Sequence, residues 1–336
     1  MRKILPVHEP LSATYSHTAH VLSIIGNNTI VPWWMNCFIQ IYGECPDFLD
    51  YQDFWFTECP ILHTQHIGRD MVLIGWHSMA DFVRDAIAHE YYVYAEVNIN
   101  CIGVYHASHG KSHDALIYGF DDDRQEYLIA DFFDDKRYSS AWVSYQEVEK
   151  ALLYDEQIFG GTGIFFDDIY LLKEKQDAEA VFAPDKVRDS IERYLERTPM
   201  IYGYNRFKPY SVKEVDQYLY GLDCYKLLLR MASDSGTGEP LPMRWRQVSH
   251  LMYEHKKVMC SRIQYMEERG ILKYGDHYLR IFQDLAEEML MTRNLLLRYS
   301  ITQRADDLKR IHPHIDRVCK AESEALSDLA ADIIVS

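Results

Sequence analysis

The sequence predicts an α+β protein with an antiparallel sheet in its first half and an all-helical second half. Three observations predict this division. Residues 90–172 hold four segments rich in aromatic and β-branched side chains, a composition typical of strands. From about residue 176 onward, apolar side chains recur at steps of three or four residues, which indicates amphipathic helices. The length of 336 residues also favours two domains, because single hydrophobic cores stop growing near roughly 250 to 300 residues.

The elements of the first half follow from local patterns. Two short helices are predicted at residues 16–25 and 33–42, ahead of the strands. The strands are expected at residues 91–99, 115–120, 126–133 and 163–172. A further helix is expected over residues 144–154, because Ser144 can cap its N-terminus and Glu147 completes a capping box.

The second half is predicted to be a helical bundle. Its helices are expected at residues 185–197, 212–231, 245–266, 278–299 and 316–333. The charged, alanine-rich segment from Lys173 to Pro184 separates the two halves. The predicted domains are therefore residues 1–175, which carry the sheet, and residues 176–336, which carry the bundle.

The charge balance argues against several classes of partner. With 35 Lys and Arg against 51 Asp and Glu, the formal net charge is -16, and no local basic patch offsets it. Nucleic acid and anionic membrane surfaces are therefore not expected as partners. The N-terminus lacks the apolar core of a signal peptide, and no run approaches the ~18 apolar residues of a membrane span. We expect a cytoplasmic protein.

Neither a metal nor a bound cofactor is expected. The seven cysteines are scattered and contain no C-x-x-C pair, which favours reduced thiols over a disulfide scaffold or a structural zinc site. His63, His66 and His77 match no standard ligand pattern, and His17 and His20, which share a helical face at i and i+3, lack a Glu-rich partner that would make them a metal pair. The glycine-rich segment Gly160 to Gly163 precedes a strand instead of opening a helix, so it does not have the arrangement of a phosphate loop.

The segment from Ser112 to Asp131 carries the main candidate for chemistry. Asp121 to Asp123 form a turn, and a hairpin closed there pairs residue numbers that sum to about 244. In this register His113 faces Asp131. An imidazole held in one tautomer by a carboxylate is the base of a nucleophilic triad, and the carboxylate is its orienter. The alternative is a solvated edge histidine and a strand-end aspartate, because hairpin registers shift easily.

Two residues are candidates for the nucleophile. In papain-type folds the nucleophile lies at the N-terminus of an early helix, where the helix dipole lowers the pKa of a thiol. Cys37 is a candidate because it closely follows Pro32, and proline is favoured at the first helical position. Ser16 is a candidate because it starts the earlier helix. The alternatives are a small buried core residue for Cys37 and a plain N-cap for Ser16.

Four motifs distributed over most of the chain support a family resemblance. They are His113-Asp-Ala-Leu-Ile-Tyr-Gly-Phe-Asp, Tyr127-Leu-Ile-Ala-Asp-Phe-Phe, Leu251-Met-Tyr-Glu-His-Lys-Lys-Val-Met and Arg293-Asn-Leu-Leu-Leu-Arg-Tyr-Ser-Ile-Thr. Together they resemble the butirosin-biosynthesis H family. Its members are papain-like, peptidase C39-like proteins associated with nonribosomal peptide and antibiotic biosynthesis, so the resemblance implies a papain-like first domain.

The resemblance implies an acyltransferase that forms amides. In the family, a cysteine takes an acyl group from the phosphopantetheine thioester of an acyl or peptidyl carrier protein and passes it to a small-molecule amine. By position, His113 is implied as the general base and Asp131 as its orienter. Relatives place the cysteine in the early helix, where this chain has Ser16. Either Cys37 or Ser16 therefore serves as the nucleophile, or the site has lost its chemistry.

Two other functions stay open. One is a cysteine peptidase or thioesterase-type hydrolase, and the other is a non-catalytic scaffold that retains the fold. An acidic carrier protein would need a local basic patch for docking, for which Arg244 with Arg246, or Lys256 with Lys257, are the candidates. A homodimer is also compatible with the sequence.

Overall fold

The computed structural model describes residues 1–52, 59–106, 111–133, 137–153, 155, 168–199, 218–236 and 239–334. The chain divides into two compact units. The first unit combines Met1–Val31 with Phe56–Ala180, and the second combines Pro32–Trp55 with Val181–Ser336. Residues 32–55, which the sequence analysis counted with the first domain, therefore pack with the second unit.

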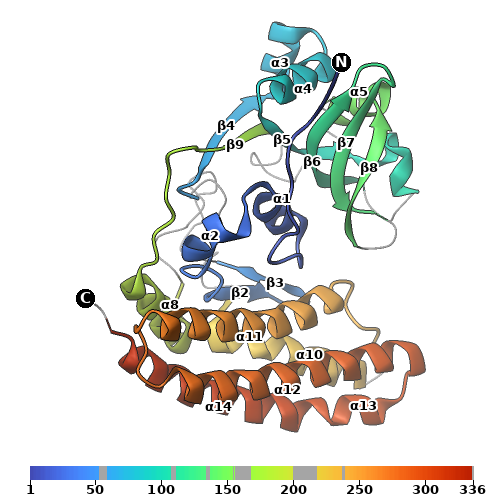
Figure 1. Ribbon diagram of the computed structural model, residues 1–336. Coiled ribbons are helices and arrows are strands. Elements are labelled where there is room, and N and C mark those ends of the chain that lie inside the picture. Colours follow the sequence, from blue (N-terminus) through green and yellow to red (C-terminus); the bar gives the residue numbers. More distant parts are fainter. Residues whose placement is uncertain are drawn as a thin grey trace. The chain divides into compact units, whose positions relative to one another are not determined.

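A seven-stranded antiparallel sheet forms the centre of the first unit (Figure 1). Its strands are β1 (Arg2–Ile4), β4 (Leu62–Gly68), β5 (Tyr92–Asn98), β6 (Ser112–Asp121), β7 (Glu126–Phe132), β8 (Tyr138–Ser144) and β9 (Asp168–Glu174). The order is β4-β9-β5-β6-β7-β8, with β1 paired to β6. The predicted strands correspond to β5, β6, β7 and β9, although the part of the last one before residue 168 lies outside the described residues. This sheet and the helical C-terminal part confirm the α+β prediction.

Short helices pack against this sheet. They are α1 (Ser16–Ile24), α3 (Arg69–Trp76), α4 (Met79–Ala88) and α5 (Tyr145–Leu152). Helix α1 contacts β6 and β7, and almost all of its residues are buried, so it has a fixed position on the sheet. The predicted capping box is present, because Ser144 and Glu147 satisfy each other's backbone amides at the start of α5.

The predicted helix at residues 33–42 is wrong. The observed helix α2 (Asn27–Trp34) starts earlier, and Pro32 lies near its end instead of at its beginning. After α2, the amide of Cys37 bonds to the carbonyl three residues earlier, and Phe38 has a φ of 64°. A tight turn followed by a left-handed residue is a common way for a helix to end. Cys37 therefore follows the C-terminal end of a helix and does not lie near an N-terminus.

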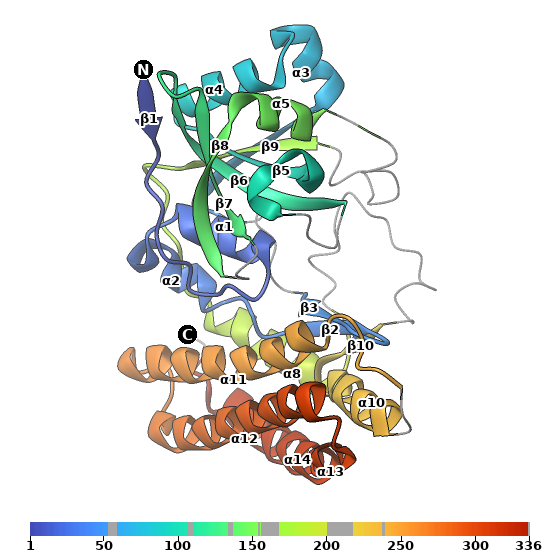
Figure 2. The ribbon, with the colours of Figure 1, turned by 90° about the vertical axis from the view of Figure 1, so that its right-hand side faces the viewer.

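Helices make up most of the second unit. They are α8 (Pro184–Glu196), α10 (Tyr225–Gly236), α11 (Trp245–Glu268), α12 (Gly275–Thr302), α13 (Ala305–Lys309) and α14 (Ile311–Asp332). Helices α11, α12 and α14 lie side by side in both views (Figures 1 and 2). Periodicity predicted α8, α11, α12 and α14 correctly. Among the described residues, none of the helices, including the long α12, is apolar enough over a sufficient length to cross a membrane.

The second unit is not purely helical, contrary to the prediction. A small antiparallel sheet in the order β10-β2-β3 belongs to it, formed by β2 (Ile41–Glu44), β3 (Phe48–Tyr51) and β10 (Leu219–Tyr220). The predicted helix at 212–231 begins only at Tyr225, because residues 219–224 form β10 and a 3-10 turn. Residues 212–217 lie outside the described part of the chain. Strands of two to four residues are too short to produce a recognisable period in the sequence.

Candidate functional site

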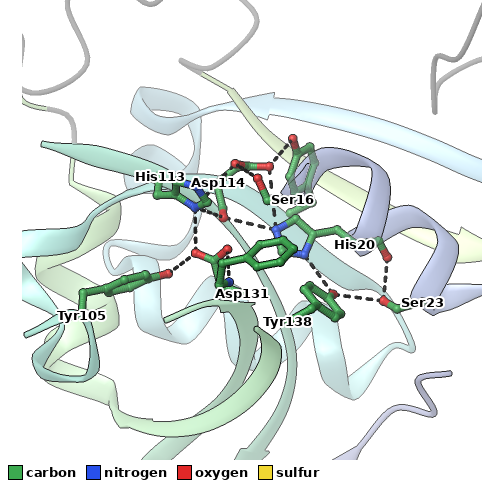
Figure 3. A network of polar contacts seen from close by, with 10 residues as sticks. Ser16, His20, Ser23, Tyr105, His113, Asp114, Asp131 and Tyr138 are labelled. Atoms are coloured by element: carbon green, nitrogen blue, oxygen red, sulfur yellow. Dashed lines mark hydrogen bonds and ion pairs between the residues drawn. The ribbon is translucent and has the colours of Figure 1, made fainter. Parts of the chain in front are cut away.

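A polar network on β6 and β7 contains the predicted histidine and aspartate (Figure 3). His113 Nδ1 lies 2.8 Å from Asp131 Oδ2 and 3.1 Å from the carbonyl oxygen of Asp114. Asp131 is fully buried, whereas the side chain of His113 is 41% exposed. Because both partners of Nδ1 are acceptors, we assign the proton to Nδ1. Nε2 is then the ring nitrogen available for exchanging a proton with another group.

The two side chains meet in a different register from the predicted one. The predicted sum of 244 would place His113 directly opposite Asp131. In the structure Leu116 pairs with Ala130, a shift of two residues, whereas the pairs between the turn and a β-bulge at residues 117–119 are shifted by three. On the His113 side of the bulge, the shift of two keeps side chains on their predicted face, so the histidine and the aspartate become diagonal neighbours on the sheet. The contact is therefore retained although the register was wrong.

Tyr105 completes the surroundings of the buried carboxylate, and sequence reasoning missed it. Its hydroxyl donates to Asp131 Oδ2 at 2.5 Å, the same oxygen that His113 contacts. The backbone amide of Phe132 donates to the other oxygen at 2.6 Å. Tyr105 ends a 3-10 turn that precedes β6, and no local pattern connects that turn with Asp131. These donors hold the carboxylate in the orientation that it presents to the imidazole.

The electrostatic surroundings favour the protonated form of His113. Burial acts to lower the pKa of His113, but the hydrogen bond to Asp131 and the charges of Asp131 and Asp114 outweigh it. Together they raise the pKa of His113 from 6.5 to about 9. The resting imidazole is therefore largely an imidazolium at neutral pH.

Ser16 lies in the same network, at the first position of α1 (Figure 3). Tyr15 is the N-cap residue of that helix, so Ser16 is not the plain cap that was its alternative interpretation. Its hydroxyl donates instead to Asp114 Oδ1 at 2.6 Å. No acidic residue lies in the first turn of α1, so the positive end of the helix dipole is not neutralised from within the helix.

Asp114 links the serine to the histidine, and the sequence analysis did not select it. Its Oδ1 lies 2.6 Å from Ser16 Oγ and 3.7 Å from His113 Nδ1. Its Oδ2 accepts a hydrogen bond from the Tyr94 hydroxyl at 3.1 Å. Burial would raise the pKa of Asp114, but nearby histidines and the bond from Ser16 lower it below its ordinary value. Asp114 therefore places a second carboxylate in the site.

His20 forms the buried side of the network. It is fully buried on α1, and its Nε2 donates to the carbonyl oxygen of Asp114 at 3.2 Å. Its Nδ1 accepts from the Tyr138 hydroxyl at 3.0 Å. Burial is the largest influence and lowers the pKa of His20. A neutral histidine with hydrogen bonds at both ring nitrogens holds α1 in position on the sheet. Among the described residues, no group of three or more His, Cys, Asp or Glu side chains could hold a metal ion.

Cys37 lies outside this network. It belongs to the second unit, where its side chain is buried and its carbonyl oxygen accepts a hydrogen bond from Arg262 of α11. It also follows the C-terminal end of α2, where the helix dipole disfavours a negative charge. Its burial and its position after a helix C-terminus are those of a core residue and not of an activated thiol.

One of the two proposed docking patches is contradicted. Lys256 is fully buried and forms an ion pair with Glu322, so it cannot present its charge to a partner. Lys257, Arg244 and Arg246 are exposed. The helical period explains the difference, because neighbouring residues on α11 point to different sides of the helix.

Comparison of the chain with protein-family models and with curated proteins found no match. A hydroxyl at a helix N-terminus, an imidazole and a buried carboxylate are the parts required for nucleophilic acyl transfer. The glycine-rich segment Gly160 to Gly163, which is not expected to bind phosphate, lies outside the described residues.

Proposed function

We propose that the protein is a papain-like, peptidase C39-like acyltransferase with a serine nucleophile. It moves an acyl group from the phosphopantetheine thioester of a carrier protein to a small-molecule amine, in the cytoplasmic biosynthesis of a nonribosomal peptide or related antibiotic. The observation that carries the proposal is the contact of His113 with the buried Asp131, in one network with Ser16 at the start of α1. Ser16 is the nucleophile, His113 the base and Asp131 its orienter.

The reaction has two balanced steps. Ser16 Oγ attacks the thioester carbonyl, the C–S bond breaks, and the hydroxyl proton passes through His113 Nε2 to the leaving thiolate. The product is an acyl ester on Ser16 and a free thiol. The amine then attacks this ester, the C–O bond breaks, and a proton from the nitrogen returns through His113 to the serine oxygen. The result is an amide and the regenerated enzyme.

The helix N-terminus at Ser16 supports the oxyanion that this chemistry forms, whereas the Asp114 carboxylate, 2.6 Å from Ser16 Oγ, opposes it. Amides at a helix N-terminus point outward, and the positive end of the dipole favours negative charge there. Each preorganised donor to an oxyanion contributes roughly 3 to 4 kcal/mol in well-studied enzymes. In the proposed mechanism, the Ser16 hydroxyl leaves Asp114 and turns to the imidazole when the substrate enters.

Product analysis tests the proposal. The full chain is incubated with an acyl N-acetylcysteamine thioester, which mimics the end of phosphopantetheine, and with a panel of primary amines. We expect an amide, and His113→Ala should lose it. The matched control is His66→Ala, because His66 forms a similar exposed pair with Asp168 at 2.6 Å on the same sheet and should not affect the product. Free acid as the main product would instead indicate the hydrolase.

A substitution of the nucleophile offers a second test. Ser16→Cys introduces a cysteine in the early helix, where members of the resembled family have theirs. Its thiol, linked to His113 through Asp114, should react with iodoacetamide faster than the seven native cysteines, which are all free thiols. Labelling no faster than Cys101, a partly exposed thiol outside the network, would argue against an activating site.

A non-catalytic scaffold is the second candidate, and one observation favours it. The Ser16 hydroxyl donates to Asp114 in the resting structure, and this aspartate has a lowered pKa and so is a weak base. If the fold acts only in binding, His113→Ala will leave both folding and the yield of the pathway product unchanged. A loss of yield with folding intact supports the enzyme.

A further inference from the structure

We propose that the exposed face of α12 binds an acidic amphipathic helix of a partner protein. This face lies in the second unit and uses none of the residues assigned to acyl transfer. The inference therefore does not depend on the proposed function. Three features carry it: a groove, a row of exposed apolar side chains and a local reversal of charge.

The groove runs along one helix. It has a volume of about 470 Å³, and its lining includes Glu287, Leu290, Met291, Asn294 and Arg298 of α12 together with Arg310. Arg310 lies between α13 and α14. The α12 residues are spaced at three and four, so they share one side of the helix. A groove along a helix matches the way in which an amphipathic helix docks on a folded protein.

Exposed apolar side chains continue this face toward the end of α12. Met291, Leu297 and Ile301 are 41%, 40% and 76% exposed. The opposite side of α12 packs in the core through residues such as Phe282 and Met289. From residue 287 to residue 301 the face is roughly 21 Å long, which suits a partner helix of about four turns. Exposed apolar side chains in a continuous row are typical of a surface that binds another protein.

The charge around the groove differs in sign from that of the whole protein. The chain has a net charge of -16, whereas the residues that line the groove include two arginines, Arg298 and Arg310, and one glutamate, Glu287, a net charge of +1. Arg298 is half exposed although it pairs with Asp307, and Arg310 has no ion pair within the described residues. An acidic helix complements these arginines. Glu287 at the other end of the groove would repel acidic side chains. The acidic residues of the partner helix are therefore expected near Arg298 and Arg310.

An anionic membrane is a weaker alternative. A face with apolar and basic residues can lie on lipid, but a protein of net charge -16 is repelled by an anionic surface beyond its own basic region. The hollow between α12 and Arg310 also suits a rod-like partner better than a flat surface. We therefore assign the face to an acidic helix and include vesicles in the test.

A matched pair of helical peptides tests the proposal. Both have about 15 residues, to match the face, with leucines at helical spacing on one side; one carries glutamates on the other side, and its twin carries lysines. Fluorescence anisotropy with the full chain should show binding of the acidic peptide, weakened by salt. The basic twin should bind at least roughly tenfold more weakly.

Variants locate the site. Arg310→Glu should weaken binding of the acidic peptide roughly tenfold. Met291→Glu should weaken binding by a similar factor, because it places a charge in the apolar row. Both side chains are exposed, so folding should be retained. Lys320→Glu is the control, because Lys320 is exposed on α14 and does not line the groove. Equal binding of the two peptides, insensitivity to both groove variants, or binding to phosphatidylserine vesicles with no binding of the acidic peptide would overturn the proposal.

Discussion

Both units contain a cluster of buried titratable groups, and these two clusters differ in how completely their polar atoms are satisfied. The cluster in the second unit joins four helices through Tyr194, Tyr225, His255, Lys256 and Glu322. The cluster in the first unit surrounds His113 and Asp131. The comparison distinguishes a structural network from a reactive one.

The cluster in the second unit is closed. The buried ammonium of Lys256 has three acceptors, which equals its number of donors: Glu322, the Tyr194 hydroxyl and His255 Nδ1. His255 Nε2 donates to the carbonyl of Ile39 at 2.8 Å, and Glu322 Oε2 accepts from Tyr225 at 2.6 Å. Burial lowers the pKa of Lys256, and the Glu322 carboxylate opposes this effect. Such a network stabilises one arrangement of α8, α10, α11 and α14.

The cluster in the first unit is open. Asp131 is buried with donors on both oxygens, but His113 is partly exposed, and its Nε2 has no partner within the described part of the chain. Its pKa is raised, and a second carboxylate, Asp114, lies beside it. Perturbed groups that are accessible and incompletely paired are typical of functional sites.

Breaking the closed cluster should produce the largest effect. Glu322→Ala leaves the Lys256 ammonium buried without its counter-ion, which we expect to destabilise the second unit by about 3 to 5 kcal/mol. Urea denaturation followed by tryptophan fluorescence measures this change. The control is Glu324→Ala on the same helix, whose exposed pair with Lys320 should change stability by less than about 1 kcal/mol. A similar loss of unfolding free energy in the two variants would mean that the buried pair stabilises the fold no more than the exposed pair does.

Breaking the open cluster should affect activity more than stability. His113→Ala and Asp131→Asn remove the base and its orienter, and we expect kcat to fall by roughly 10²- to 10⁴-fold. Circular dichroism should show the fold of the alanine variant to be retained, because the histidine is partly exposed. A large loss of structure with His113→Ala would place the open cluster in the same class as the closed one.

The contribution of the open cluster to stability should depend on pH. The pKa of His113 is raised from 6.5 to about 9 in the folded protein, so its ion pair stabilises the fold fully below pH 6.5. This contribution is lost as pH rises through about 9. The stability difference between the wild-type protein and His113→Gln should therefore shrink over that range. A difference that stays constant from pH 6.5 to 9 would contradict the raised pKa.

Activity should follow the opposite trend over the same range. The base must be neutral to accept a proton, and at neutral pH most of His113 is protonated. The rate of acyl transfer should therefore rise with pH up to about 9 and then level off. A pH–rate profile measures this trend, and a rate already constant at neutral pH would exclude His113 as the titrating base.

Tyr105→Phe should have the smallest effect. It removes the hydroxyl that shares Asp131 Oδ2 with His113, and the loss of this bond should cost about 1 kcal/mol of stability. The carboxylate would then interact more strongly with the imidazole, so the pKa of His113 should rise further. NMR titration of the His113 ring measures the shift. An unchanged or lowered pKa would show that Tyr105 does not restrain Asp131.

The sequence predicted the elements with strong periodicity and missed those defined by tertiary contacts. The aromatic strands and long amphipathic helices were predictable because each repeats a burial pattern over many residues. The helix at 33–42 failed because the apolar run around Pro32 fits a helix and a buried loop equally well. Residues 32–55 pack with the second unit through contacts that no local pattern encodes.

The candidate site was predictable only where it lies within one hairpin. The proximity of His113 and Asp131 depends on face and not on exact register, so it could be inferred from spacing. Asp114 and Tyr105 enter the site through side-chain directions and a 3-10 turn, neither of which has a sequence signature. Cys37 was favoured because Pro32 suggested the start of a helix just before it, but α2 ends at Trp34 and Cys37 follows that end.

Peptide mapping of the acylated protein tests the central claim most directly. The full chain is mixed with a thioester in the absence of amine, quenched and digested, and the acyl group is located by mass spectrometry. The account predicts an acyl ester on Ser16 that is absent from His113→Ala. Acylation of another residue, or equal acylation of Ser16 with and without the histidine, would contradict it.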